Sequence, residues 1–168
     1  GLSEAPAMMP AAGKFLRDRL AARKRWGAKT RRVSYFVGCA MECVLPEIGE
    51  VSVDVLGAAG YEVSAARNVC CGLPAYVYGD VESARALARQ NIRAMRGLGG
   101  EAIIADCASC SSFLKDYPRL LGEDDSMRAE AEALAARVRD LSEFLASIEL
   151  PGDMKPVRAI VTYHDPCH

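Results

Sequence analysis

The chain has 168 residues, 51% of them hydrophobic, which is enough to bury one core. It contains no run of about eighteen apolar residues and no visible secretory segment, which argues against a membrane span or an exported protein.

The net charge of −1 hides an uneven distribution, because residues 1–32 carry nine Lys or Arg against two acidic residues, whereas the remainder carries twelve against twenty. We therefore predict a basic linker or arm over 1–32. The alternative is a short amphipathic helix that docks on a partner or an anionic lipid. A single basic arm without a recognisable binding fold does not indicate nucleic acid.

Apolar periodicity predicts alternating strands and helices from residue 33 onward. The β-branched and aromatic run 33–37 is typical of a buried strand. A helix is predicted to begin near Pro46 and to end at Gly60, and a short strand follows over 61–64. The inner face of the helix is assigned to Ile48, Val51, Val55 and Ala59.

The second half of the chain repeats this alternation. Asp80 is predicted to cap a helix that ends near Gly97, and its inner face is assigned to Val81, Ala84, Ala88, Ile92 and Met95. A third strand is predicted over 102–105, and a short helix over 110–121. Apolar residues at helical spacing then predict a longer amphipathic helix over 134–148, and a fourth strand is predicted over 157–163.

Strands separated by helices indicate an α/β fold with a small parallel sheet of about four strands, layered as in Rossmann and flavodoxin folds. The carboxyl ends of parallel strands lie at one edge, and this edge is where such sheets bind ligands. Residues that follow the predicted strands are therefore expected to meet there, near helix amide ends that favour anions.

Five of the seven cysteines follow these strands. Adjacent cysteines do not easily bond to each other, whereas a polynuclear cluster offers each of them a separate iron. The sequence therefore predicts that the five converge on one metal centre at the carboxyl edge. In chain order they are Cys39, the pair Cys70-Cys71 before Gly72, and the Cys-x-x-Cys pair Cys107 and Cys110. Cys43 is predicted as a small buried side chain, with a ligand role as the alternative. Asp106 is predicted to accept local backbone hydrogen bonds in the turn, with electrostatic tuning of the site as the alternative.

This cysteine layout resembles the cysteine-rich CCG domain found in the B subunit of heterodisulfide reductase and in the iron-sulfur subunits of glycolate, lactate and anaerobic glycerol-3-phosphate oxidoreductases. The resemblance covers Val33 to His168. It implies that the five cysteines hold a non-cubane [4Fe-4S] cluster, which an isolated fragment can lose in air. The alternatives are a structural zinc bound by four of them, or a module that keeps only some ligands.

The resemblance also implies a role and a context. The domain would transfer electrons within a flavin-linked 2-hydroxyacid or glycerol-3-phosphate oxidoreductase, without being catalytic alone. Its partners would be a flavoprotein dehydrogenase subunit and other iron-sulfur modules. The complex would lie in the cytoplasm or on the cytoplasmic face of the membrane. The alternatives are thiol-disulfide chemistry at the cluster, as in heterodisulfide reductase, and a zinc-stabilised interaction module.

The same resemblance divides the chain and predicts that it is a fragment of a larger subunit. Residues 33–156 would form a first CCG domain, and 157–168 would supply its last strand and the truncated start of a second module. Cys167 would then be the first ligand of that second module. His164 and His168 are predicted to form local hydrogen bonds in a turn, with metal binding as the alternative.

Overall fold

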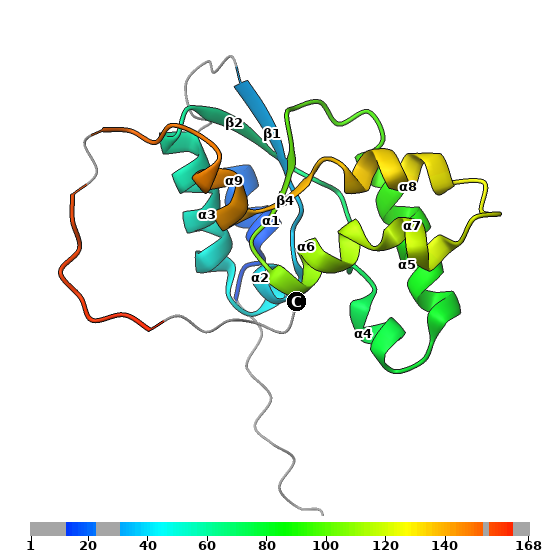
Figure 1. Ribbon diagram of the computed structural model, residues 1–168. Coiled ribbons are helices and arrows are strands. Elements are labelled where there is room, and N and C mark those ends of the chain that lie inside the picture. The colour runs from blue at the N-terminus through cyan, green and yellow to red at the C-terminus, as the bar shows by residue number, and fades with distance from the viewer. Residues whose placement is uncertain (1–12, 23–30, 153–154, 163–168) are drawn as a thin grey trace, which may run out of the picture.

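A computed structural model describes residues 13–22, 31–152 and 155–162 of the chain. Its centre is a parallel four-stranded sheet with the strand order β2-β1-β3-β4, which confirms the predicted α/β fold (Figure 1). Three of the strands lie close to their predicted positions. The strands are β1 (Arg31–Tyr35), β2 (Tyr61–Ala65), β3 (Ile103–Ala105) and β4 (Val138–Asp140).

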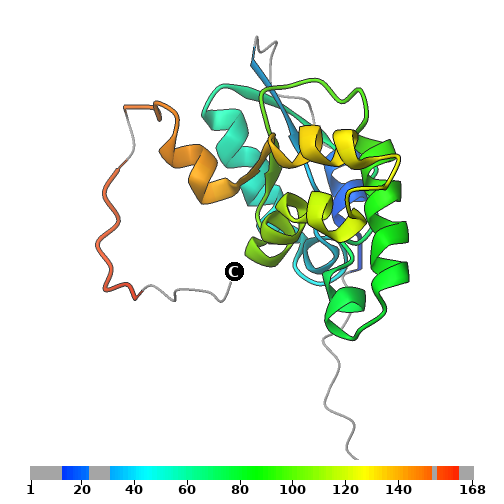
Figure 2. The same ribbon diagram turned by 45° about the vertical axis from the view of Figure 1, so that its right-hand side comes forward.

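Helices cover both faces of the sheet (Figures 1 and 2). Successive strand residues point to opposite faces, so Val33 and Tyr35 pack on one side while Phe36 packs on the other. The first side is covered by α1 (Leu16–Ala22), α3 (Pro46–Ala58) and α9 (Leu141–Ala146). The other is covered by α5 (Val81–Met95), α6 (Ala108–Lys115), α7 (Tyr117–Leu121) and α8 (Arg128–Ala135). Two short helices, α2 (Cys39–Cys43) and α4 (Leu73–Val77), follow β1 and β2.

Helix α5 forms as predicted. The Asp80 carboxylate accepts a hydrogen bond from the Ser83 N–H, which satisfies one of the free amide groups at the start of the helix. Its buried residues are Ala84, Ala88, Asn91, Ile92 and Met95, so the predicted apolar face also contains an amide side chain.

The predicted inner face of α3 is wrong. Ile48, Val51 and Val55 are exposed, and the buried positions include Gly49, Ser52 and Leu56. The reason is close packing against α1, since a Cβ at Gly49 would lie 2.3 Å from a methyl carbon of Leu16. The small residues Gly49 and Ser52 therefore share the inner face with Leu56, and the predicted branched side chains face outward.

The predicted long helix over 134–148 is also wrong. It is divided into the end of α8, the strand β4 and helix α9. Leu134 and Val138 are both buried, but Leu134 lies in α8 and Val138 lies in β4. Their spacing in the sequence is the same as that of residues on one face of a helix. Asp140 and Glu143 form a reciprocal capping box that starts α9. The Asp-x-x-Glu spacing was the sequence signal for this break.

The segment 155–162 is not a strand of the sheet in this structure. The described part of the predicted strand 157–163 has no regular structure, and Val157, Ile160 and Val161 are exposed. The fourth place in the sheet is taken by β4, which pairs with β3 at Ile103 and Val138. The predicted helix over 110–121 is likewise two helices, α6 and α7, with Pro118 in the first turn of α7.

Part of the basic N-terminal segment belongs to the domain. Leu16 of α1 is fully buried against Tyr35, Val37 and Val53, where the sequence predicts a linker. Its neighbour Arg17 forms an ion pair with Glu42 of α2, with 3.3 Å between nitrogen and oxygen. In the described part of the chain, none of the helices has the length and apolarity needed to cross a membrane.

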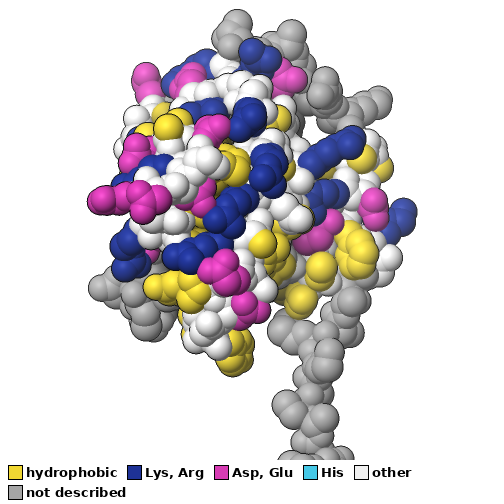
Figure 3. All heavy atoms as spheres, turned by 90° about the vertical axis from the view of Figure 1, so that its right-hand side faces the viewer, with side chains coloured by type: hydrophobic (Ala, Val, Ile, Leu, Met, Phe, Trp, Pro, Cys, Tyr) yellow, Lys and Arg dark blue, Asp and Glu magenta, His cyan; other side chains and the backbone are white. Residues whose placement is uncertain are grey.

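On the face formed by α5, α7 and α8, basic side chains alternate with acidic ones (Figure 3). Arg89 pairs with Asp125, and Arg96 pairs with Glu130. Opposite charges therefore neutralise each other locally, and an exposed pair such as Arg96–Glu130 contributes little to stability.

Candidate metal centre

The carboxyl edge of the sheet collects the cysteine-bearing loops. Strands β1 and β3 are neighbours, but the chain continues from them to opposite sides of the sheet, to β2 and to β4. This reversal of strand order creates a crevice in which open α/β sheets bind ligands. Cys39 follows β1 and begins α2, whereas Cys107 follows β3 and precedes α6. Cys70 and Cys71 lie in the loop between β2 and α4.

The five predicted cysteines come together in a continuous series of contacts. The Cys110 Sγ lies 3.6 Å from the Cys71 Sγ. Cys107 lies next to Cys110, and Cys39 lies next to Cys70, closely enough for each pair to influence a thiol pKa. Gly38 lies beside this group, and a Cβ there would make an ordinary van der Waals contact with the Cys110 Sγ at 3.8 Å. All five thiols are free. Their function as ligands stays a prediction.

Two of these thiols are strongly acidified. The Cys110 thiol is the main cause of a fall in the pKa of Cys71 to about 7 and in the pKa of Cys107 to about 6. Backbone N–H groups of Leu73 at Cys71, and of Ser109 and Cys110 at Cys107, lower these pKa values further. Thiolates are the metal-binding form of cysteine, so these two residues are suited to bind a metal at neutral pH.

The pKa values of Cys70 and Cys110 shift in the opposite direction. Burial raises the pKa of Cys70 to about 11. Hydrogen bonding to Cys107 and Cys71 raises the pKa of Cys110, because its proton stabilises the neighbouring thiolates. The site without metal therefore combines thiolates with neutral thiols, and binding a metal to all of them would release protons.

Buried amides hold the Cys-Cys-Gly loop in place. The Asn68 side chain accepts a hydrogen bond from the Val37 N–H at 3.0 Å and donates one to the Val37 carbonyl at 2.9 Å. The Arg17 guanidinium donates to the Asn68 carbonyl at 2.9 Å. On the other side of the loop, Asn91 donates to the Cys70 carbonyl at 2.9 Å.

These supporting residues were missed at the level of sequence. The supporting role of Asn91 could have been detected from the sequence, because this residue interrupts the apolar face of α5 and a buried amide needs hydrogen-bond partners. Asn68 lies in an irregular loop, and nothing in its local pattern marks it.

Asp106 is held by hydroxyl groups, so the prediction of local backbone hydrogen bonds is wrong. Tyr35 and Ser52 donate to its Oδ2 atom at 2.5 Å and 2.8 Å. Its Oδ1 atom is buried and has no hydrogen-bond partner within the described residues. Burial, with the Asp106 charge as a further cause, raises the pKa of Tyr35 far above its usual value.

The remaining predicted site residues are less informative. Cys43 is half-buried at the last residue of α2, and its ligand role stays untested. Cys167, His164 and His168 lie outside the described residues.

Five cysteines at one edge exceed the four ligands of a single zinc ion, and this number favours a polynuclear centre. Four thiolates around one zinc lie about 3.8 Å apart, because each Zn–S bond is about 2.3 Å long. Within the described ranges, no three Cys, His, Asp or Glu side chains form a group that could hold one metal ion. The Cys71 and Cys110 sulfurs are 3.6 Å apart, which also fits the zinc spacing, so it is the number of cysteines that favours a cluster.

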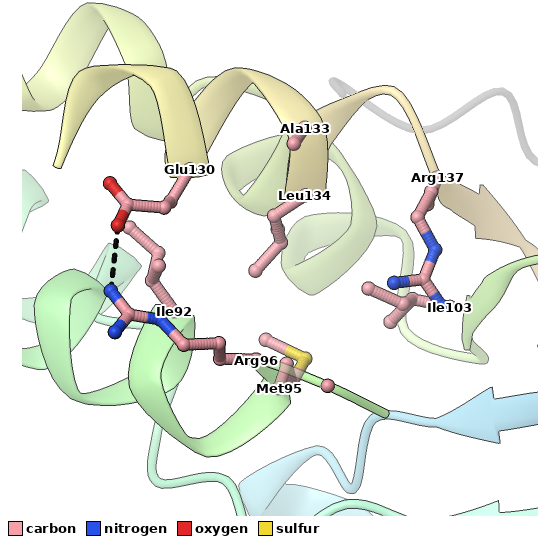
Figure 4. A pocket seen from close by; sticks show the side chains of 9 residues that line it. Ile92, Met95, Arg96, Ile103, Glu130, Ala133, Leu134 and Arg137 are labelled. Carbon is pink, nitrogen blue, oxygen red and sulfur yellow. Dashed lines mark hydrogen bonds and ion pairs between the residues drawn. The ribbon is translucent and has the colours of Figure 1, made fainter. Parts of the chain in front are cut away.

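A pocket of about 200 Å³ lies elsewhere, between α5, α8 and β3 (Figure 4). Apolar side chains including Ile92 and Leu134 line it. Glu130 pairs with Arg96, and Arg137 donates to the Leu98 and Gly100 carbonyls. Each charged group in the lining therefore already has a partner, and no cysteine reaches this pocket.

The fold and the thiol-lined edge define a parallel α/β domain with a cysteine-rich site. Residues 33–115 match the family model of the cysteine-rich CCG domain, and this part of the chain belongs to that family. No solved structure matches the chain.

Several curated relatives are similar over 82% of this chain. The B subunit of fumarate reductase (CoM/CoB) from Methanothermobacter marburgensis is 37% identical, and the match covers 26% of that protein. An uncharacterized iron-sulfur protein from Methanococcus maripaludis is 35% identical, with 25% of its length covered. Lactate utilization protein A from Geobacillus kaustophilus is 32% identical, with 57% covered. The chain thus spans between a quarter and just over half of these relatives.

Proposed function

We propose that this domain binds an iron-sulfur cluster through Cys39, Cys70, Cys71, Cys107 and Cys110. The observation that carries the proposal is the continuous series of sulfur contacts at the carboxyl edge, with two thiols already acidified. The similarity to proteins named as iron-sulfur proteins supports it. Five ligands exceed the four of an ordinary cubane, so the proposed cluster is a non-cubane [4Fe-4S] centre.

The chain's own residues would stabilise such a group. Backbone N–H groups of Gly72, Leu73, Ser109 and Cys110 help to lower the pKa values of nearby cysteines, so these loops present partial positive charge to the thiolates. A bound cluster would supply one-electron transfer at an edge where Cys39 is exposed.

We further propose that the parent protein is the iron-sulfur subunit of a flavin-linked oxidoreductase of 2-hydroxyacids or glycerol-3-phosphate. The relative named for lactate utilization supports the 2-hydroxyacid class. In this proposal a separate flavoprotein oxidises the substrate, and this domain, in the cytoplasm, passes electrons onward with other iron-sulfur modules.

Anaerobic reconstitution tests the cluster. Residues 13–168, supplied with ferrous iron, sulfide and reductant, should give a brown protein with about four irons and four sulfides per chain. A colourless protein that binds one zinc instead would refute the proposal. The control is a variant with the five cysteines replaced by serine, which should bind neither the cluster nor zinc.

A further inference from the structure

Two fully buried polar side chains contact the backbone of the Cys-Cys-Gly loop. The Tyr117 hydroxyl of α7 donates to the Cys71 carbonyl at 2.8 Å. The Asn91 amide of α5 donates to the Tyr117 oxygen and to the Cys70 carbonyl, both at 2.9 Å. Consecutive carbonyls of the loop are thus bound by one small network.

The direction of every hydrogen bond in this network is fixed. The Val69 N–H can only donate, so the atom that it contacts at 2.9 Å must be the Asn91 oxygen. The Asn91 nitrogen must then be the donor to its other partners. The Tyr117 hydroxyl accepts from Asn91, and its own proton is directed to the Cys71 carbonyl, which can only accept. No member of the network can rotate or flip without losing a partner.

Peptide geometry carries this constraint to the sulfur of Cys70. The peptide between Cys71 and Gly72 is trans and planar, so its N–H points opposite to its carbonyl. Tyr117 holds the carbonyl, so the Gly72 N–H points the opposite way, toward the Cys70 side of the turn. Burial raises the pKa of the Cys70 thiol, and this N–H partly offsets the rise, as a donor close to that sulfur would. Gly72 has a φ of 96°, which places the chain in the left-handed region and completes the tight turn.

We propose that Tyr117, supported by Asn91, is a positioning residue that sets the reduction potential of the centre by holding the Gly72 N–H against the sulfur of Cys70. This inference rests on the cluster proposed above. Reduction adds negative charge to a cluster and its sulfurs, and an N–H group directed at a sulfur stabilises that charge. The network therefore raises the reduction potential, and its removal lowers it.

The test is Tyr117→Phe, which removes one hydroxyl and keeps the ring that packs edge-on against Phe113 at 5.9 Å. In the reconstituted protein, a redox titration followed by electron paramagnetic resonance should give a midpoint potential more negative than that of the wild type, at equal iron content. In the metal-free protein, nuclear magnetic resonance should show faster hydrogen exchange of the Gly72 amide. Asn91→Ser provides a second variant, and it should shift both measurements in the same direction.

Tyr61→Phe is the matched control. Tyr61 is also fully buried, but its hydroxyl lies 3.5 Å from Glu101 and it begins β2, at the edge of the sheet away from the cysteines. It should change neither the potential nor the Gly72 exchange. An unchanged potential in a fully loaded Tyr117→Phe protein, or an equal shift in Tyr61→Phe, would overturn the inference while the cluster stands. A wild-type protein that binds no iron after reconstitution would overturn the proposed function and the redox role together. An unchanged rate of Gly72 exchange in metal-free Tyr117→Phe would refute the positioning of the loop by Tyr117 as well.

Discussion

The two halves of the cysteine site are held in different ways. Cys107 and Cys110 lie directly after β3, at the start of α6, so a strand end and a helix turn place both of them. Cys70 and Cys71 lie in a loop whose position depends on Asn68, Asn91 and Tyr117, residues that come from separate parts of the chain. One half is therefore built locally, and the other is built by tertiary contacts. Serine substitution, thiol chemistry and glycine substitution each probe this difference.

The largest expected effect comes from removing one sulfur from each half. Cys71→Ser and Cys110→Ser should each sharply lower the iron content after reconstitution or change the electron paramagnetic resonance spectrum. A serine hydroxyl does not readily provide the anionic, soft ligand that iron-sulfur clusters use. Metal analysis and spectroscopy would check this result, and Cys39→Ser should behave in the same way.

Cys43→Ser is the matched control for these variants, because Cys43 lies one helical turn from Cys39 on α2. It should keep the wild-type iron content and spectrum. Loss of the cluster in Cys43→Ser together with retention in Cys110→Ser would show that the ligands were assigned to the wrong residues.

The second effect is a difference in thiol reactivity between Cys107 in one half and Cys70 in the other. The pKa of Cys107 is lowered to about 6, chiefly by the Cys110 thiol, whereas burial raises the pKa of Cys70 to about 11. Thiolate forms as the pH rises through the pKa, so alkylation of Cys107 in the metal-free protein should level off above pH ~7. Alkylation of Cys70 should still increase at pH ~9. At neutral pH, Cys107 should react about a hundredfold faster, after allowing for the lower nucleophilicity of a more acidic thiol.

Mass spectrometry of iodoacetamide-treated protein would measure these rates residue by residue. Cys110→Ala should move the Cys107 profile to higher pH, because it removes the main cause of the shift. Identical profiles for Cys70 and Cys107 would contradict the opposite pKa shifts of these two thiols.

The same contrast explains what could be predicted from the sequence. The strand-loop-helix alternation around β1, β2 and β3 is a local pattern, and it correctly placed the five cysteines at one edge. The outer and inner faces of α3 could not be predicted, because Gly49 faces the core only when Leu16 of α1 packs on it. The strand β4 has three residues of which only Val138 is apolar, so it gives no strand signal, whereas the equally short β3 is wholly apolar. Likewise, the support from Asn68 and Tyr117 depends on contacts between residues that are more than thirty positions apart in sequence.

The smallest expected effect concerns the turn that follows the paired cysteines. Gly72 has a φ of 96°, and a Cβ there would lie 3.3 Å from the Ala84 carbonyl oxygen of α5. Gly72→Ala should therefore add crowding to the cost of a left-handed alanine and lower the free energy of unfolding by about 2–4 kcal/mol. Gly79→Ala is the matched control, because Gly79 has a φ of 84° but no heavy atom within 4 Å of the added Cβ. It should lose only about 1–2 kcal/mol. Urea unfolding of the metal-free proteins, followed by circular dichroism, would compare the two variants. Equal losses would show that the close approach of the loop to α5 adds nothing to its stability, and that the loop is held by its hydrogen bonds alone.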